Sequence, residues 1–395
     1  MRQLLSSNSL SLLHAERFVR MALDSGFLTR KRRPAYERSG RRCVSVVDLF
    51  CGCGGLTLGL AEALRRGRRS LRVPLAVDWD LKAATVFKRN FPAANVVCGP
   101  VEGLFDGEDG DPLTIKERRV RKLVGNVDVL VGGPPCQGHS NLNNHTRRTD
   151  RRNSLHWLLA RAAVVLQPRI VIIENVPDVL RDKKKVVERT RDTLLLAGFG
   201  VGDGLVDLCS LGLPQKRRRH LLIAGRNLPV ELSQLFADLI GAQESQRDVR
   251  WAIESTAHGA NGDPLSVPSA VTPANVKRIK WLFANKAYDL PDRLRPRCHR
   301  DEDHSYKSVY GRLRWDLPSQ TITGGFGSMG QGRFVHPSRS RTLTPREAAR
   351  LQFFSDFFDF TPAVGRTAWA ELIGNAVPPL LTLRLGSQLI ESGLL

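Results

Sequence analysis

One cysteine stands where an apolar run ends, and its setting raises the question of whether its thiol is a nucleophile. The stretch DVLVGGPPCQGHS, residues 128–140, places Cys136 directly behind two prolines. Proline fixes the backbone φ angle, so the two rings stiffen the turn and set the direction of the sulfur. A thiol that only packs in a core requires no such frame. The pattern favours a nucleophile, with a buried packed thiol as the alternative.

An acidic residue ends the next apolar run along the chain. The stretch IIENVP, residues 172–177, carries Glu174 where this run stops. A carboxyl group there can share or donate a proton, while a thiol on the neighbouring strand end can form a covalent bond. The two groups together suit nucleophilic attack on a polarised heterocycle.

A glycine-rich turn and an acidic strand end indicate a nucleotide site. The stretch DLFCGCGGLTLGL, residues 48–60, runs from a strand through glycines into a helix, where backbone amides can approach a ligand. The next strand ends in VDWD, so Asp78 can hold ribose hydroxyls and Trp79 can stack on a base. A tight strand–helix turn and a surface Asp beside a core Trp are the alternatives.

The elements that must position these residues alternate between short apolar runs and longer amphipathic segments. Such alternation predicts an α/β fold with a doubly wound, mostly parallel, Rossmann-like sheet. The carboxyl ends of its strands form one edge, where ligands bind. The strands that we expect are Val44 to Phe50, Val73 to Asp80, Ala94 to Cys98, Val127 to Gly133, Arg169 to Val176 and Arg218 to Gly225.

The chain divides into four parts by composition. Residues 1–42 combine a helix-like segment with the basic tail RKRRPAYERSGRR and are expected to form an appended arm. Residues 43–225 carry the strand–helix alternation, and 226–338 lose it, which predicts a smaller, irregular second domain. Helical patterning resumes in 339–395, which we expect to complete the first domain. Polar residues interrupt the apolar N-terminus, so neither a signal peptide nor a membrane span is expected.

Charge and cysteine content narrow the functional class. The formal net charge is +21, which predicts a polyanionic partner, with an arginine-biased surface as the alternative. Seven cysteines without paired spacing argue against a disulfide framework and favour a reducing cytosol. The CGC at Cys51 and Cys53 lacks a second metal-type pair, so no metal is expected.

Taken in order, the motifs resemble those of the cytosine-5 DNA methyltransferase family, which uses S-adenosylmethionine. The resemblance extends from about Cys43 to the C-terminus. Any one block could occur by chance, whereas eight in the family's order are specific. The blocks are DLFCGCGG, VDWD, GGPPCQGHS, DRRNSL, ENV, PQKRRR, RTLTPREAARLQ and GNAVPP.

The resemblance implies roles for individual residues. Cys136 would be the nucleophile, Glu174 would contact nitrogen 3 of cytosine, and Arg217 and Arg219 would organise the base pocket and a nearby phosphate. The stretch 226–338 would be the target-recognition domain. The implied cofactor-binding residues are Phe50, Cys51, Gly52, Gly54, Gly55, Asp78, Trp79, Pro100, Val101 and Asn375, and the implied DNA-binding residues are Ser140, Arg147, Arg148, Arg151, Arg152 and Thr323.

The implied reaction transfers a methyl group to carbon 5 of a cytosine flipped out of double-stranded DNA. The thiolate of Cys136 would add to carbon 6, and S-adenosylhomocysteine would leave as the product. The resemblance further implies a monomeric bacterial modification enzyme, cytoplasmic and associated with the nucleoid, with a cognate restriction endonuclease as a possible partner. A tRNA methyltransferase and a DNA-binding regulator without activity are the alternatives.

Three positions depart from the family's pattern. His139 and Ser355 stand where the family commonly has Phe and Pro, and both changes look tolerable. The third is more serious, because Pro100 occupies the place of an Asp that faces the adenine amino group. Proline offers neither a carboxylate nor an N–H, so we expect weaker cofactor binding than in the family at large.

Overall fold

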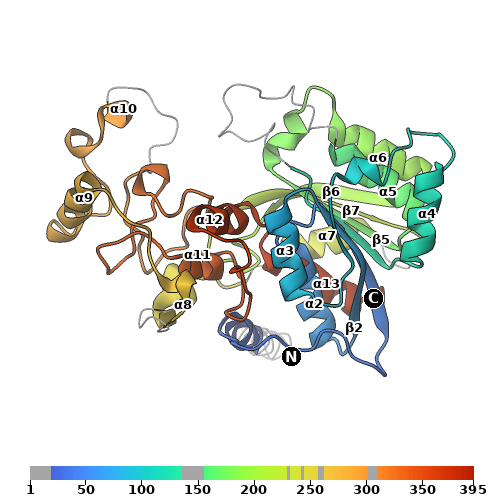
Figure 1. Cartoon of the computed structure of the whole chain (residues 1–395), viewed down its shortest axis with the longest axis horizontal. Coiled ribbons are helices and arrows are strands. Elements are labelled where there is room, and N and C mark those ends of the chain that lie inside the picture. Colours follow the sequence, from blue (N-terminus) through green and yellow to red (C-terminus); the bar gives the residue numbers. More distant parts are fainter. Residues whose placement is uncertain (1–18, 136–154, 229–231, 242–243, 257–261, 301–308) are drawn as a thin grey trace, which may run out of the picture.

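The structure is a computed structural model of the whole chain. It describes residues 19–135, 155–228, 232–241, 244–256, 262–300 and 309–395. Figure 1 shows two lobes, one built around a β-sheet and one that contains α9 and α10.

The central feature of the larger lobe is a seven-stranded sheet in the order β3-β2-β1-β4-β5-β7-β6. All neighbouring pairs are parallel except those of β7, which runs antiparallel to both β5 and β6. The expected doubly wound, mostly parallel α/β fold is therefore confirmed. The strands are β1 (Cys43–Leu49), β2 (Ser70–Asp78), β3 (Val96–Cys98), β4 (Val129–Gly132), β5 (Ile170–Asn175), β6 (Gly200–Asp207) and β7 (Arg218–Gly225).

Helices cover both faces of this sheet (Figure 1). On one face α2 (Gly55–Arg66), α3 (Leu81–Asn90), α7 (Leu232–Gly241) and α13 (Pro379–Glu391) contribute to one apolar core. On the other, α4 (Ile115–Val124), α5 (Leu155–Leu166) and α6 (Val186–Leu196) contribute to a second. Side chains alternate between the two cores along β5, because successive residues of a strand point to opposite faces.

The last helix of the chain returns to the first helix after β1. The approach of α13 to α2 is so close that a Cβ atom at Gly59 would lie 2.0 Å from the carbonyl oxygen of Pro379. The hydroxyl of Thr382 donates to the carbonyl of Leu56 at 2.7 Å. The C-terminal helix therefore packs on the sheet lobe.

The smaller lobe contains short helices and long irregular connections. Ile279, Leu282, Leu290 and Val335 contribute to a small apolar core of its own. Helix α7 falls within residues 226–338, the range expected for the second domain, but it packs on β6 of the sheet lobe. The remaining helices are α8 (Val249–Ile253), α9 (Pro273–Ala284), α10 (Arg297–Arg300), α11 (Pro345–Leu351) and α12 (Arg366–Asn375). Of these, α8, α11 and α12 bury side chains in the core that contains α2 and α13. Short 3₁₀ turns are η1 (Val101–Gly103), η3 (Pro177–Arg181), η4 (Glu254–Thr256), η5 (Pro264–Ser266), η6 (Asp292–Leu294) and η7 (Met329–Gln331).

The described part of the segment expected to form an arm, residues 19–42, packs on the sheet lobe. It begins with a helix over residues 19–28 and buries Phe27, Leu28 and Tyr36 in the core that contains α2 and α13. The fully buried carboxylate of Asp24 pairs with Arg66, Arg247 and Arg384. These ion pairs join the segment to α2, to α13 and to the chain just before α8.

The six expected strands are all present, with ends that differ by up to three residues. Sequence patterning missed the seventh, β6, whose residues GVGDGLVD alternate glycine with polar and apolar side chains. Glycine and aspartate are depleted in strands, so this stretch is typical of a loop. Pairing with β7 along its whole length makes it an edge strand instead.

Candidate active site

The strands that precede the chemical motifs end at one edge of the sheet. Leu49 of β1 pairs with Val77 of β2 and with Gly132 of β4, and Gly132 pairs with Ile173 of β5. Each motif follows directly after one of these residues. Sheet register therefore brings the glycine-rich turn, the VDWD stretch, the GGPPC stretch and Glu174 to one edge, as expected for a ligand site.

The glycine-rich turn between β1 and α2 adopts a backbone that favours glycine. Gly52 has a φ of 52° and Gly54 a φ of 100°, in the left-handed region. A Cβ atom at Gly54 would lie 2.8 Å from the ring of Phe91, whereas one at Gly52 would meet no atom within 4 Å. Gly54 is thus required for close packing, and Gly52 presents its backbone to open space.

Asp78 holds this turn in place. Its Oδ2 accepts a hydrogen bond from the backbone N–H of Gly52, and its Oδ1 accepts one from the N–H of Asp80. Burial raises the pKa of Asp78, although these two N–H donors oppose the rise. Each carboxylate oxygen can accept a further bond, so the group can also receive two hydroxyl donors.

A second carboxylate lies deeper beneath the same turn, and sequence reasoning gave it no role. Asp48 is fully buried, and its Oδ2 accepts a bond from the Thr57 hydroxyl at 2.6 Å. Its Oδ1 has no hydrogen-bond partner among the described residues. Burial raises the pKa of Asp48 to about 7, and the charge of Asp78 adds to the rise. Such an unpaired buried oxygen is a candidate acceptor for a cationic or hydroxyl group of a ligand.

Next to Asp78 the surface changes from polar to aromatic. The side chain of Trp79 is 73% exposed, which leaves its ring available for stacking. Pro100 is exposed and immediately precedes η1. Val101 is buried in the core on the α4 side of the sheet, so a ligand contact there would use its backbone. Glu102, beside it, is exposed.

Neither thiol of the glycine-rich turn is suited to be a nucleophile. Cys51 and Cys53 are both buried. Burial raises the pKa of Cys53 to about 12 and raises that of Cys51 as well, so both remain protonated thiols near neutral pH. Phe50, which precedes them, has a φ of 58° and packs against the apolar core.

An ion pair joins the ends of β5 and β7. The Nε atom of Arg219 lies 2.6 Å from Oε1 of Glu174, and both side chains are largely buried. The other oxygen, Oε2, lies toward Gly133, since a Cβ atom there would be 3.5 Å from it. The described chain continues from Gly133 to Pro135, and Cys136 lies outside the described residues.

Arg217 belongs to a buried polar network that links three of the motifs. Its guanidinium donates to the carbonyls of Ile322 and Ala376 at 3.2 and 3.0 Å. Gln215 donates to Gln352, whose amide in turn donates to the carbonyl of Ile373. The glutamines stand in quoted motifs, but nothing in sequence spacing showed that they would meet.

The network fixes the loop that contains GNAVPP beside the strand ends. A Cβ atom at Gly374 would lie 2.1 Å from the backbone nitrogen of Gly324, so the loop touches the residues next to Thr323. The carbonyl of Val377 would lie 2.1 Å from a Cβ atom at Gly55. Asn375 is exposed between these contacts. The structure thus brings Asn375 and Thr323 near each other and near the glycine-rich turn.

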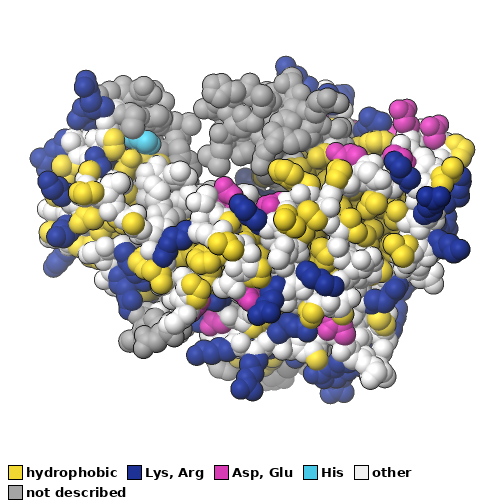
Figure 2. Space-filling model, in the orientation of Figure 1, with side chains coloured by type: hydrophobic (Ala, Val, Ile, Leu, Met, Phe, Trp, Pro, Cys, Tyr) yellow, Lys and Arg dark blue, Asp and Glu magenta, His cyan; other side chains and the backbone are white. Residues whose placement is uncertain are grey.

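Ser140, Arg147, Arg148, Arg151 and Arg152 lie outside the described residues. On the face shown in Figure 2, Lys and Arg side chains are spread over both lobes. In the described ranges no helix is both long and apolar enough to cross a membrane. Across the same ranges, no group of His, Cys, Asp or Glu side chains is arranged to hold a metal ion.

Comparisons with known proteins agree with one another. Residues 44–391 match the family model for C-5 cytosine-specific DNA methylases. Type II methyltransferase M1.BsuMI of Bacillus subtilis is 40% identical over 362 residues, which cover 92% of this chain and 84% of that protein. Type II methylase M.HgiDII of Herpetosiphon aurantiacus is 31% identical, over 85% of this chain and 92% of the other.

Solved structures show the same fold at lower identity. A putative DNA modification methyltransferase from an E. coli prophage superposes with a TM-score of 0.60 at 23% identity, covering 88% of this chain and 99% of that one. The S. pombe Dnmt2 methyltransferase superposes with a TM-score of 0.59 at 16% identity, covering 88% and 98%.

Proposed function

The chain belongs to the C-5 cytosine-specific DNA methylase family and is a DNA (cytosine-5-)-methyltransferase, and from that premise we propose how its residues divide the work. The proposed substrate is a cytosine flipped out of double-stranded DNA, because the faces of a stacked base are closed to an attacking thiolate. Members of the family use S-adenosylmethionine, which supplies an electrophilic methyl group when bound.

The edge formed by β1, β2 and β3 fits this cofactor. Asp78 would accept the ribose hydroxyls, and the exposed ring of Trp79 would stack on the adenine. The open space at Gly52 leaves room for the methionine part beside backbone N–H groups. The unpartnered Oδ1 of Asp48 would accept from the cofactor's ammonium group, directly or through water.

Cys136 would act as the nucleophile. Its thiolate adds to carbon 6 of cytosine, and the electron pair displaced from the ring double bond makes carbon 5 nucleophilic. Carbon 5 then takes the methyl group. Loss of the carbon 5 proton, to water, returns the electron pair to the ring and expels the thiolate.

Glu174 would contact the base while Arg219 holds Glu174 in position. The Oε1 atom is engaged by Arg219, which leaves Oε2 for a hydrogen bond at nitrogen 3 of the ring. That bond would balance the charge that develops on the ring as sulfur adds to carbon 6. Arg217, fixed by the carbonyls of Ile322 and Ala376, would hold the loops around the base.

Recognition and biological context follow from the parts around this site. The smaller lobe would read base edges in a groove of the DNA, and the basic segment 137–155 would close over the flipped base. The relatives from Bacillus subtilis and Herpetosiphon aurantiacus are a type II methyltransferase and a type II methylase, so we propose that this chain is a modification enzyme that protects DNA from a cognate restriction endonuclease. We expect it to act as a monomer on chromosomal DNA.

The observation that carries the assignment is the Glu174–Arg219 pair beside the strand end that leads into Cys136. Its test is Cys136→Ala, which should abolish methyl transfer and leave cofactor binding intact, because the sulfur acts only on cytosine. DNA that contains 5-fluorocytosine should trap the wild type covalently, since fluorine is not lost as a proton is. A folded Cys136→Ala protein that still methylates DNA would refute the role, and bisulfite sequencing of cells that express the wild type would reveal the target.

A further inference from the structure

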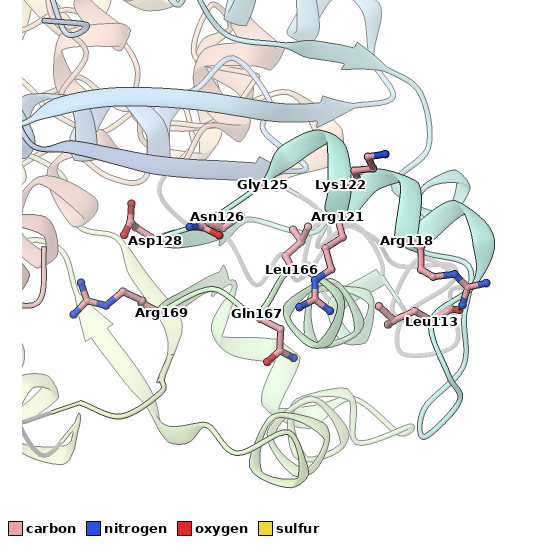
Figure 3. Close-up of a pocket in the computed structure, with 11 residues that line it drawn as sticks. Leu113, Arg118, Arg121, Lys122, Gly125, Asn126, Asp128, Leu166, Gln167 and Arg169 are labelled. Carbon is pink, nitrogen blue, oxygen red and sulfur yellow. The ribbon is translucent and has the colours of Figure 1, made fainter. Parts of the chain in front are cut away.

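A basic hollow lies at the opposite edge of the sheet from the strand ends that carry the motifs. It has a volume of about 740 Å³ and lies between the end of α4 and the starts of β4 and β5. Figure 3 shows these side chains. The lining residues are Leu113, Arg118, Arg121, Lys122, Gly125, Asn126, Val127, Asp128, Leu166, Gln167 and Arg169.

The positive charges of this hollow are not compensated within the described protein. Arg121, Lys122 and Arg169 make no ion pair with any described carboxylate, and Arg118 donates to the carbonyl of Leu113. Asp128 is the single acidic residue among the lining residues. Its Oδ2 already accepts a bond from a backbone N–H of β1 at 2.8 Å. Four cations against one carboxylate give the hollow a positive potential.

The cations lie along the hollow instead of converging on one point. In Figure 3, Arg118 and Arg121 follow one another along α4, and Arg169 lies at the far end on the β5 side. Arg72 donates to the carbonyls of Val124 and Asn126, at the edge of the hollow. A single phosphate or carboxylate would require converging donors. A row of separated cations instead matches an extended chain of phosphates.

We propose that this hollow binds the sugar–phosphate backbone of a second DNA segment, outside the catalytic cleft. Arg118, Arg121 and Arg169 would meet successive phosphates, and the amides of Asn126 and Gln167 offer further donors to phosphate or sugar oxygens. Such contacts carry no sequence information. The proposal rests on the proposed function only for the identity of the polyanion.

Because the hollow and the catalytic edge lie at opposite ends of the strands, one molecule can hold two duplexes at once. A segment held by the hollow remains near the protein while the other occupies the cleft. The enzyme would then pass between distant DNA segments without full release, since a second contact keeps the local DNA concentration high.

A bridging assay tests this directly. The full chain is loaded on an immobilised duplex, and a fluorescent duplex of A·T pairs alone is added, which contains no cytosine for the active site. Wild type should retain the second duplex. The triple variant Arg118→Glu, Arg121→Glu, Arg169→Glu should lose at least about 90% of the retention. For binding of the A·T duplex, the slope of the logarithm of affinity against the logarithm of salt concentration should fall in magnitude by about 3, because each phosphate contact contributes about 0.9.

A matched control separates the hollow from overall charge. The exposed residues Lys31, Arg32 and Arg33, changed to Glu together, alter the net charge equally, and none of them lines the hollow. This control should bridge as wild type does. Equal loss in both variants, equal retention in both, or no bridging by the wild type would each overturn the proposal.

The outcome is independent of the catalytic assignment. Methyl transfer to bulk DNA should persist in the triple variant, because none of its three residues lies at the catalytic edge. If the wild type bridges DNA but transfers no methyl group, the proposed function fails and the second site stands. If the wild type transfers methyl groups but does not bridge DNA, the second site fails and the proposed function stands.

Discussion

Arg219 lies 2.6 Å from Glu174, and the pair joins the beginning of β7 to the end of β5. The two strands run antiparallel, so the first side chains of one meet the last side chains of the other. The carboxylate is thereby fixed from one side, and its second oxygen remains available toward the strand end that leads to Cys136.

Removal of this guanidinium should affect turnover more than cofactor binding. We expect Arg219→Ala to lower kcat by about 10²–10³, the usual cost of losing one group that stabilises developing charge. Arg219→Lys keeps the charge without the planar fork and should be intermediate. Single-turnover kinetics and calorimetry with S-adenosylmethionine provide the two measurements. Arg218→Ala, at the exposed neighbour on β7, is the matched control and should leave kcat nearly unchanged. A loss of cofactor affinity in Arg219→Ala would contradict the assignment.

Asp48 should make the free energy of unfolding depend on pH. Its pKa rises from 3.8 to about 7 on folding, so the folded protein binds this proton more tightly than the unfolded chain. The contribution of this group to stability is therefore greatest below pH 4 and is lost as pH rises to about 7. Asp48→Asn should raise the free energy of unfolding at pH 8 by up to about 4 kcal/mol.

Urea denaturation of wild type and Asp48→Asn at pH 5 and pH 8 measures this difference. The gain should be smaller at pH 5, where the wild-type carboxyl is already protonated. Asp192→Asn, at an exposed position, should show no such pH dependence. The same Asp48→Asn protein should bind S-adenosylmethionine more weakly, because an amide cannot compensate an ammonium charge.

Pro100→Asp should strengthen cofactor binding. Pro100 is exposed at the start of η1, where a carboxylate could reach the adenine amino group. A hydrogen bond to a charged partner contributes about 1.5–3 kcal/mol, less whatever water already supplies there. Asp78→Ala should weaken binding. Titration calorimetry tests both; unchanged affinity in a folded Pro100→Asp protein would mean that Glu102 or stacking on Trp79 already holds the adenine.

Asp24→Asn should destabilise the whole sheet lobe. Burial raises the pKa of Asp24, but Arg384, Arg247 and Arg66 outweigh it and hold that pKa well below its usual range. Loss of the carboxylate leaves buried guanidinium groups without compensation, at a cost of about 3–5 kcal/mol. The wild-type contribution is present above pH 4 and falls as pH drops below it.

Chemical denaturation measures this cost. Glu254→Gln breaks an exposed ion pair with Arg250 and should change stability by less than about 1 kcal/mol. If Asp24→Asn proves equally mild, the buried cluster does not hold residues 19–42 in place.

The sequence predicted those features that depend on short stretches of the chain. Six strands followed from their apolar runs, and the position of Glu174, Asp78 and the glycines at one edge followed from the rule that parallel strands share a carboxyl edge. The edge strand β6 did not, because its glycines and aspartates resemble a loop and only pairing with β7 makes it a strand.

Contacts between residues far apart in the sequence could not be predicted from these local patterns. Gln215 and Gln352 meet across 137 residues of sequence, and the hydroxyl of Ser355 donates to the carbonyl of Phe27 across 328. Ser355 stands where the family commonly has proline, which has no donor to offer. The difference looked merely tolerable in sequence, whereas in the structure it contributes to holding residues 19–42 on the core.

The packing of α13 on α2 also constrains the order of events during synthesis. The hydrogen bond from Thr382 to Leu56 spans 326 residues, so α2 leaves the ribosome long before its partner exists. The apolar face of α2 therefore stays uncovered while the rest of the chain, including the smaller lobe, is translated, and contacts of such long range slow folding. A chain that stops short of α13 would lack the core's closing layer. A fragment produced by premature termination is therefore expected to aggregate. It should have no methyltransferase activity, and should not act as an enzyme of altered specificity.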